Sequence, residues 1–260
     1  MFPIAAGAVA PSRPGGRPAF WAATGRSGGT SAAPYSSLNL AGYVADDPEH
    51  VAENRRRVAR ALGLDPDRLA LMDSVHGAEV AFVGAPGVVP GVDALVTQEP
   101  DLAVMALGAD CVPLALVGDD DRTVAAVHCG WRGLVVDVVG AAVGAMADHG
   151  SGIAHAVIGP AVCGTCYPVP PDRARLVAES GRGAVADAAL VTCPDGQPGI
   201  DVRRGVVARL LGLGLPAESL TVVGGCTVED PQLFSYRRDG RTGRQGIAVC
   251  RSGPGRIEAS

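Results

Sequence analysis

Five short apolar runs between residues 78 and 128 constrain the fold of this chain more than any other feature. They read AEVAFVG, DALVT, LAVMAL, VPLALVG and TVAAVH, and Gly, Pro or Asp separates each run from the next. Apolar runs of this length with such boundaries are typical of buried strands. The chain is therefore expected to be built around extensively buried β-sheet.

Three longer stretches repeat their apolar residues at helical spacing instead. In DDPEHVAENRRRVARALGL, Asp46 or Asp47 can cap a helix whose first turn contains Pro48. GLVVDVVGAAVGAMADHG, which closes on Gly150, and GIDVRRGVVARLLGLGL predict two more helices. Further strands are predicted in IAHAVIGP, SLTVVGG, LFSYRR and QGIAVCR, the last two as a pair around a Gly-rich turn. Because strands and helices do not alternate regularly, the pattern favours α+β layers over a doubly wound sheet.

The chain is predicted to form a single domain. Residues 1–18 are rich in Pro and Gly and are expected to form a flexible tail, and residues 253–260 a short C-terminal one. Between them, over residues 19–252, no linker is long or polar enough to divide the chain. With 47% hydrophobic and 19% charged residues, the 260-residue chain has enough apolar material for a substantial core.

The composition excludes several classes of function. All 22 basic residues are Arg, so neither a lysine Schiff base nor a P-loop ending in GK[ST] can form. The net charge is −5 and the basic run Arg55–Arg57 lies in a helical pattern, so no nucleic-acid partner is expected. No membrane-spanning segment or signal peptide is predicted. The seven cysteines are expected to be reduced thiols in the cytoplasm.

Three motifs place metal-binding side chains where predicted strands begin or end. SVHGAEV contains His76, GADCVP contains Asp110 and Cys111, and AAVHCGWRGL contains His128. Strand ends on one edge of a sheet bring distant residues together, and ligands collect there. One Cys and two His suit Zn²⁺ or copper, and three protein ligands leave a fourth position open, as in catalytic zinc sites. The hypothesis is therefore a metal site of His76, Cys111 and His128.

The residues alone leave other roles open. A His after an apolar strand is often a hydrogen-bonded core residue, and a buried Cys is often a small hydrophobic side chain. Cys129 could replace Cys111 as a ligand, although in a strand it would point away from His128. The CGTC motif, Cys163 to Cys166, could be a redox pair or half of a zinc site. Because no second CxxC exists, these two are interpreted as structural thiols near the site.

The order of the motifs resembles a known family. SVHGAEV, DALVT, GADCVPLALV, AAVHCGWRGL, GPAVCGTCYPV, DVRRGVVARLL and CTVEDPQLFSYRRDGRTGRQG follow one another between Phe20 and Cys250. The chain is thereby similar to the YfiH family, also called the polyphenol oxidase, laccase-domain or DUF152 family. The resemblance implies a single-domain, layered α/β/β/α sandwich with mixed sheets. It also implies a site for zinc, or sometimes copper, made by His76, Cys111 and His128.

The resemblance further implies an activity. Family members are expected to be purine nucleoside phosphorylases acting on adenosine, inosine and methylthioadenosine, with associated adenosine deaminase activity. The implied partners are a purine nucleoside and phosphate. Three positions depart from the family pattern, with Ser74 in place of Gln, Pro168 in place of Glu, and Cys129 where Ala is frequent. The changes at Ser74 and Pro168 affect groups around the metal more than its ligands.

Phosphate binding must rely on arginine here, because the chain has no Lys, and the planar guanidinium suits phosphate well. The predicted phosphate contacts are Arg26, Arg132 and Arg244, ahead of Arg237 and Arg238. Asn39 is a candidate contact to the sugar or base. Asp110, beside Cys111, is a candidate acid/base catalyst or an orienting partner of a ligand histidine.

Other functions fit the same residues. Cys111 with His128 or His76 could act as nucleophile and base, in a Cys–His hydrolase or amidase that edits peptidoglycan precursors. A copper-dependent, laccase-like polyphenol oxidase is a further alternative, but a laccase needs many histidines and this chain has five. An interaction module that kept the fold is the non-enzymatic alternative. Metal content separates the phosphorylase from the hydrolase, because a cysteine nucleophile acts without metal.

Overall fold

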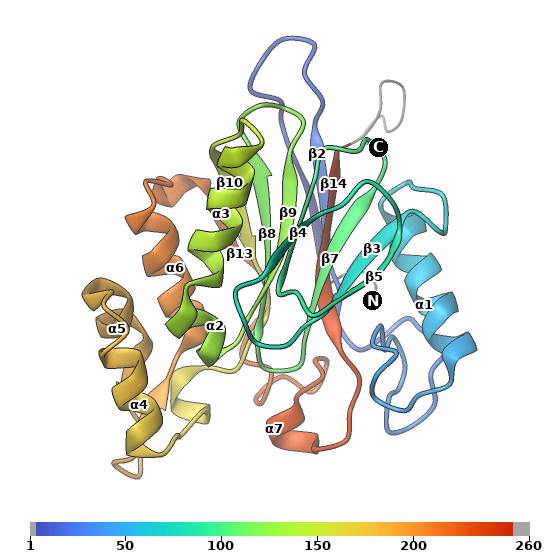
Figure 1. Ribbon diagram of the computed structural model, residues 1–260. Coiled ribbons are helices and arrows are strands. Elements are labelled where there is room, and N and C mark those ends of the chain that lie inside the picture. Colours follow the sequence, from blue (N-terminus) through green and yellow to red (C-terminus); the bar gives the residue numbers. More distant parts are fainter. Residues whose placement is uncertain (1–3, 252–260) are drawn as a thin grey trace.

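The computed structural model describes residues 4–251, and two six-stranded sheets dominate it (Figure 1). The first sheet has the strand order β1 (Ala5–Val9), β2 (Ala19–Ala23), β14 (Gln245–Arg251), β7 (Ala103–Gly108), β3 (Leu69–Asp73), β5 (Gly87–Pro90). The second has the order β13 (Leu220–Val222), β10 (Ile153–Ile158), β8 (Val112–Gly118), β9 (Val124–Cys129), β6 (Ala94–Thr97), β4 (Val80–Phe82). Both sheets mix parallel and antiparallel pairs.

Helices cover the outer face of each sheet (Figure 1). One helix, α1 (Pro48–Ala61), lies on the first sheet. The second sheet carries α2 (Trp131–Val136), α3 (Val138–Asp148), α4 (Pro171–Ala178), α5 (Gly183–Ala189) and α6 (Val202–Gly212). The smaller elements are the hairpin β11 (Leu190–Thr192) and β12 (Pro198–Ile200), the 3₁₀ turns η1 (Gly164–Cys166) and η2 (Ala217–Ser219), and α7 (Tyr236–Asp239). The expected α/β/β/α layering is confirmed.

The long apolar runs exist because both faces of the inner strands are covered. In β8, Leu114 and Leu116 pack under the helices, whereas Ala115 and Val117 pack between the two sheets. Successive side chains of a strand point to opposite faces, so a strand inside two layers must be apolar at every position. All five apolar runs identified in the sequence contain a strand.

The predicted helix over residues 133–150 is divided in the structure. Asp137 adopts a left-handed conformation with φ +66°, which ends α2, and its side chain accepts a hydrogen bond from Gly140 N and so caps α3. The same carboxylate binds Arg209 of α6 through two hydrogen bonds of 2.7 and 2.8 Å. The apolar periodicity continues across this break, so the sequence pattern does not reveal it.

Other segments also differ from expectation. The strand predicted in LFSYRR is wrong, since residues 236–239 form α7, capped by Ser235, and β14 pairs with β2 and β7 instead. Residues 5–9, expected within a tail, form β1 along β2. Residues 253–260, the predicted C-terminal tail, lie outside the described residues. Within residues 4–251, no helix has the length and apolar character to cross a membrane.

The Asp137–Arg209 contact yields a stability prediction. Asp137→Ala should lower the free energy of unfolding by about 2 kcal/mol, because it removes a helix N-cap and the carboxylate partner of Arg209. Asp137→Asn keeps a capping oxygen and tolerates the left-handed backbone, so its cost should be about 1 kcal/mol or less. Urea unfolding followed by circular dichroism measures both. Equal losses in the two variants would contradict the capping role.

Candidate metal centre

One buried carboxylate places two of the three predicted metal ligands. Asp93 directly precedes β6 and its side chain is completely buried. It accepts hydrogen bonds from the backbone N–H groups of Val75, His76 and Gly77, at 3.2, 3.0 and 2.6 Å. It also lies 2.8 Å from Nδ1 of His128. A turn after β3 and the end of β9 are thereby fixed to the same group.

The structure brings His76, Cys111 and His128 together. Their potential ligand atoms all lie within 4.8 Å of one another. Sγ of Cys111 is 3.8 Å from Nε2 of His76, and the two imidazole rings meet edge to face with centroids 4.8 Å apart. Since Asp93 holds Nδ1 of His128, the Nε2 atom of that ring is left for a metal. A borderline-soft donor set with one position open toward solvent is the arrangement of a catalytic zinc site.

The protonation states of the trio are coupled. Burial alone would raise the pKa of the Cys111 thiol, but His128 and His76 outweigh it and lower the pKa to about 6. Burial alone would lower the pKa of His128, but Cys111 and Asp93 raise it to about 9. Without metal, the site therefore contains a thiolate beside an imidazolium at neutral pH. A thiolate is the form of cysteine that binds metals.

Cys111, and not Cys129, is the cysteine whose thiol lies beside the two histidines. Cys129 is fully buried in the core between the second sheet and its helices, on the opposite side of β9 from His128. The next residue, Gly130, leaves room for the site, because a Cβ atom there would lie 3.0 Å from both Sγ of Cys111 and Cδ2 of His76. Cys111 is thus the thiol that the geometry offers to a metal.

The trio opens onto a cavity of about 720 Å³. This volume is in the range of small-molecule sites. Besides the trio, the cavity wall carries three arginines and four large aromatic residues: Arg173, Arg237, Arg244, Tyr43, Trp131, Tyr167 and Tyr236. The cavity therefore combines potential metal ligands, positive charge and flat apolar surface.

The arginines of the cavity lie against aromatic rings. The Arg237 guanidinium is 4.6 Å from the ring centre of Tyr167, and that of Arg173 is 4.8 Å from Trp131. Arg244 lies 5.9 Å from the rings of both Tyr43 and Tyr236. A guanidinium stacked on a ring is partly fixed in place. Each of the three also donates to the protein: Arg173 to the hydroxyl of Tyr167, Arg237 to the carbonyl of Pro168, and Arg244 to the carbonyls of Thr242 and Gly243. The other N–H groups of each guanidinium are the ones that a ligand in the cavity could use.

Asp110 lines the cavity, but the bonds of its carboxylate are directed to the protein. Its oxygens accept hydrogen bonds from Thr227 Oγ1 at 2.6 Å, Ser235 Oγ at 2.7 Å and Arg237 N at 2.7 Å. It contacts neither ligand histidine, so the expectation that it orients one is corrected: Asp93 has that position. Asp110 instead fixes the corner that carries Cys111.

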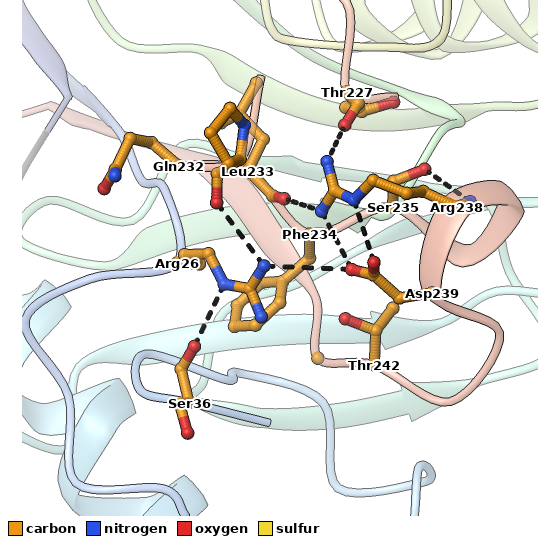
Figure 2. A network of polar contacts seen from close by, with 12 residues as sticks. Arg26, Ser36, Thr227, Gln232, Leu233, Phe234, Ser235, Arg238, Asp239 and Thr242 are labelled. Carbon is orange, nitrogen blue, oxygen red and sulfur yellow. Dashed lines mark hydrogen bonds and ion pairs between the residues drawn. The ribbon is translucent and has the colours of Figure 1, made fainter. Parts of the chain in front are cut away.

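Of the predicted substrate contacts, the structure brings Arg244 to the cavity wall. Arg26 lies in a separate polar network (Figure 2), where it donates to the carbonyl groups of Ser36 and Pro231 and pairs with Asp239 at 3.8 Å. Asn39 is buried and bonds to Ala41, Asp46 and the backbone N–H of Arg244. Arg132 is exposed, with its guanidinium over Trp131. Substrate binding by these three residues stays a prediction that their placement does not favour.

Sequence reasoning missed other residues of the site. Asp93 stands at the head of DALVT, where an Asp is most simply interpreted as a turn residue. Arg173 and Tyr167 follow the CGTC motif in a segment for which no element was predicted. Asp93 directly precedes β6 and Tyr167 directly follows η1, whereas Arg173 lies in the first turn of α4, so no single sequence signal marks all three.

Comparisons with known proteins identify the family of the chain. Residues 20–252 match the family model described as multi-copper polyphenol oxidoreductase laccase. The chain is 48% identical over 226 residues to purine nucleoside phosphorylase SCO2081 of Streptomyces coelicolor, covering 85% of this chain and 90% of the relative. It is 45% identical over 232 residues to purine nucleoside phosphorylase ORF3 of Streptomyces griseus, covering 87% and 92%.

Solved structures share the fold. Hypothetical protein YfiH of Bacillus licheniformis superimposes with a TM-score of 0.83 at 28% identity, over 89% of this chain and 92% of that one. YlmD of Geobacillus stearothermophilus gives a TM-score of 0.80 at 30% identity, over 90% and 92%. Sequence and fold give the same answer: the chain belongs to the laccase-domain family, the YfiH or DUF152 group, that its ordered motifs indicated.

Proposed function

We propose that the protein is a zinc-dependent purine nucleoside phosphorylase that acts on adenosine, inosine and methylthioadenosine, with adenosine deamination as an associated activity. One observation carries the proposal: a single cavity combines a Cys/His₂ trio with three arginines and four aromatic residues. The names of the relatives from Streptomyces coelicolor and Streptomyces griseus support it. All seven cysteines are free, which suits the reducing cytoplasm as the place of action.

The cavity offers what phosphorolysis requires. In this reaction a phosphate oxygen forms a bond to C1′ of the ribose while the bond from C1′ to the purine nitrogen breaks, and the electron pair of that bond leaves with the purine. The protein must hold the phosphate anion beside C1′ and keep the base in place. Arg173, Arg237 and Arg244 supply the charge for phosphate. Tyr43 and Tyr236, which flank Arg244, offer rings on which a purine can stack.

The donor set of the trio fits zinc. Cys111 provides a thiolate and the two histidines provide neutral nitrogens once metal displaces the shared proton. His128 is held in position by Asp93, as a metal-binding imidazole commonly is. When bound, the ion would supply a Lewis acid at the cavity wall. Copper is the second metal that these donors suit.

The proposal assigns roles to the predicted site residues from their placement. Arg244 is retained as a phosphate contact, joined by Arg173 and Arg237, which line the same cavity. Asp110 acts as a positioning residue for Cys111, because its carboxylate is already bonded to Thr227 and Ser235. Cys111 is proposed as a metal ligand rather than a nucleophile.

One observation favours a second function. The lowered pKa of Cys111 and its 3.8 Å separation from Nε2 of His76 resemble the pair of a Cys–His hydrolase. Removal of metal distinguishes the two. A hydrolase of this kind keeps its activity in a chelator and loses it on treatment with iodoacetamide, whereas the phosphorylase loses activity in the chelator.

The first prediction of this proposal concerns Cys111 and Cys129, two neighbouring cysteines of which one faces the cavity. Cys111→Ser should reduce the conversion of adenosine and phosphate to adenine and ribose 1-phosphate by at least about 100-fold, because the metal loses a protein ligand. Cys129→Ser should retain activity within about tenfold. Base release is followed by chromatography and the sugar phosphate by ³¹P NMR. Base release that does not require phosphate would contradict phosphorolysis.

The second prediction concerns Asp93. Asp93→Asn should weaken zinc binding at the trio by about 10- to 100-fold, because the amide no longer matches the donors of His128 and of the turn at residues 75–77. Asp73→Asn is the matched control, since Asp73 also lines the cavity but is exposed and outside the trio. Competition with a chromophoric chelator gives both affinities. Equal zinc affinity in the Asp93 variant and the wild type would contradict the role of Asp93 in positioning the zinc ligands.

The third prediction concerns the metal-free protein. With a pKa near 6, the Cys111 thiol is mostly thiolate above pH 6 and becomes protonated as the pH falls through that value. In the presence of a chelator, the rate at which iodoacetamide alkylates Cys111 should therefore be close to its maximum at pH 7. The rate should be several-fold lower at pH 5. Cys129, whose pKa is raised by burial, should remain unmodified. Peptide-resolved mass spectrometry measures each rate. A rate that still rises steeply above pH 8 would show that the histidines do not stabilise the thiolate.

A further inference from the structure

A second cluster of metal-binding side chains lies outside the cavity. The potential ligand atoms of Cys163, Cys166, Cys226 and Glu229 all lie within 4.8 Å of one another. None of the four is needed for the activity proposed above. The cluster joins two segments that are 63 residues apart along the chain, as Cys163 and Cys226 show.

The sequence spacing of the cluster has the form of a divided zinc site. Cys163 and Cys166 form a CxxC motif, and Cys226 and Glu229 repeat the same spacing as CxxE. Structural zinc sites are commonly built from two such pairs contributed by separate segments. The second pair escapes a search for CxxC because a carboxylate stands in its fourth position.

The local backbone directs these side chains toward one point. Cys163 precedes the 3₁₀ turn η1 and Cys166 is its last residue, and Cys166 N donates to the carbonyl of Cys163 at 3.1 Å. The backbone N–H of Cys163 donates to Sγ of Cys226 at 3.3 Å. Sγ of Cys166 lies 3.6 Å from Oε1 of Glu229. A backbone pairing between Ala161 and Cys226 aligns the two segments.

The spacing of the donor atoms suits a tetrahedral ion. With a zinc–sulfur bond of about 2.3 Å, the sulfur atoms of a tetrahedral site are about 3.8 Å apart, which is consistent with donor atoms within 4.8 Å of one another. A disulfide would use two of the thiols and leave the third beside a carboxylate. Three thiolates and a carboxylate repel one another unless a cation lies among them.

Protonation of the thiols follows the same logic. Burial raises the pKa of Cys166, and its neighbours Cys163 and Cys226 raise it further. Burial alone would also raise the pKa of Cys163, but a hydrogen bond from Thr165 and the backbone of Cys166 outweigh it and lower the pKa. Cys163 is therefore the thiol of this pair that ionises more readily.

We propose that Cys163, Cys166, Cys226 and Glu229 bind a second, thiophilic divalent cation, with Zn²⁺ as the ion that this donor set suits best. With four protein ligands the site is closed, so it is structural rather than catalytic. It ties the segment around η1 to the segment that follows β13.

The second site is connected to the cavity through hydrogen bonds to Asp110. Thr227, next to Cys226, donates to the carboxylate of Asp110, and Val162, next to Cys163, donates its N–H to the carbonyl of Asp110. Asp110 in turn precedes Cys111. A cation in the cluster would therefore hold both backbone segments that fix the corner carrying a ligand of the first site.

Zinc stoichiometry tests this proposal. Protein purified without added chelator or metal should contain two zinc ions per chain by elemental analysis. Cys163→Ser/Cys226→Ser and Cys111→Ser should each contain one, and the triple variant none. Cys250→Ser is the matched control, since Cys250 is buried in β14 of the first sheet and belongs to neither cluster, and this variant should keep two zinc ions. Equal zinc content in the double variant and the wild type would overturn the second site, as would a Cys163–Cys166 disulfide found by thiol titration of the unfolded protein.

A milder variant covers the case in which the double variant does not fold. Glu229 is exposed, so Glu229→Gln in the Cys111→Ser background should fold and bind its remaining zinc at least about tenfold more weakly than Cys111→Ser itself. Zinc should also raise the Tm of metal-free Cys111→Ser, because the ion binds the folded state alone. Unchanged affinity together with an unchanged Tm would reject the site. Neither readout uses enzyme activity, so failure of the phosphorylase proposal leaves this test intact.

Discussion

The candidate metal centre depends on the buried carboxylate of Asp93. A buried charge is costly unless its oxygens are saturated, and here three consecutive backbone N–H groups and the Nδ1 atom of His128 surround it. The backbone N–H of His128 also donates to the carbonyl of Asp93, at 2.8 Å. Both histidines are therefore held through one residue, one by its backbone and one by its ring. The carboxylate stabilises the turn at residues 75–77, and this turn sets the position of His76.

The position of Cys111, the third candidate ligand, depends on a strained corner between the two sheets. β7 belongs to the first sheet and β8 to the second, and only Ala109, Asp110 and Cys111 connect them. Asp110 has φ +105°, a conformation that residues other than glycine rarely adopt. The hydroxyl groups of Thr227 and Ser235 bind its carboxylate and offset that strain. The corner places Cys111 beside His76, which follows β3, and His128, which lies at the end of β9.

The sequence predicted the parts of this molecule that depend on residue type and periodicity. The buried strands follow from the apolar runs, and the three side chains that the structure brings together were singled out because His and Cys are rare. Asp93 could not be identified, because an Asp before a strand is also an ordinary turn residue. Its role depends on hydrogen-bond donors that lie elsewhere in the chain. Arg26 was favoured for its Gly-rich surroundings, but the fold places it against Asp239 and Phe234. Asp137 divides a helix without disturbing its apolar period. In each case long-range contacts decide the role.

The arrangement around Cys111 favours a metal ligand over a nucleophile. A cysteine nucleophile needs one base and a free face for the substrate. Here two imidazoles converge on the same sulfur, and their donor atoms lie within 4.8 Å of it and of each other. A nucleophile does not require the second imidazole, whereas a single ion at the centre would satisfy all three groups. The lowered pKa of Cys111 fits both roles, since each requires the thiolate. Convergence of three donors, rather than acidity, separates the two, and that convergence is what Asp93 and the corner at Asp110 together produce.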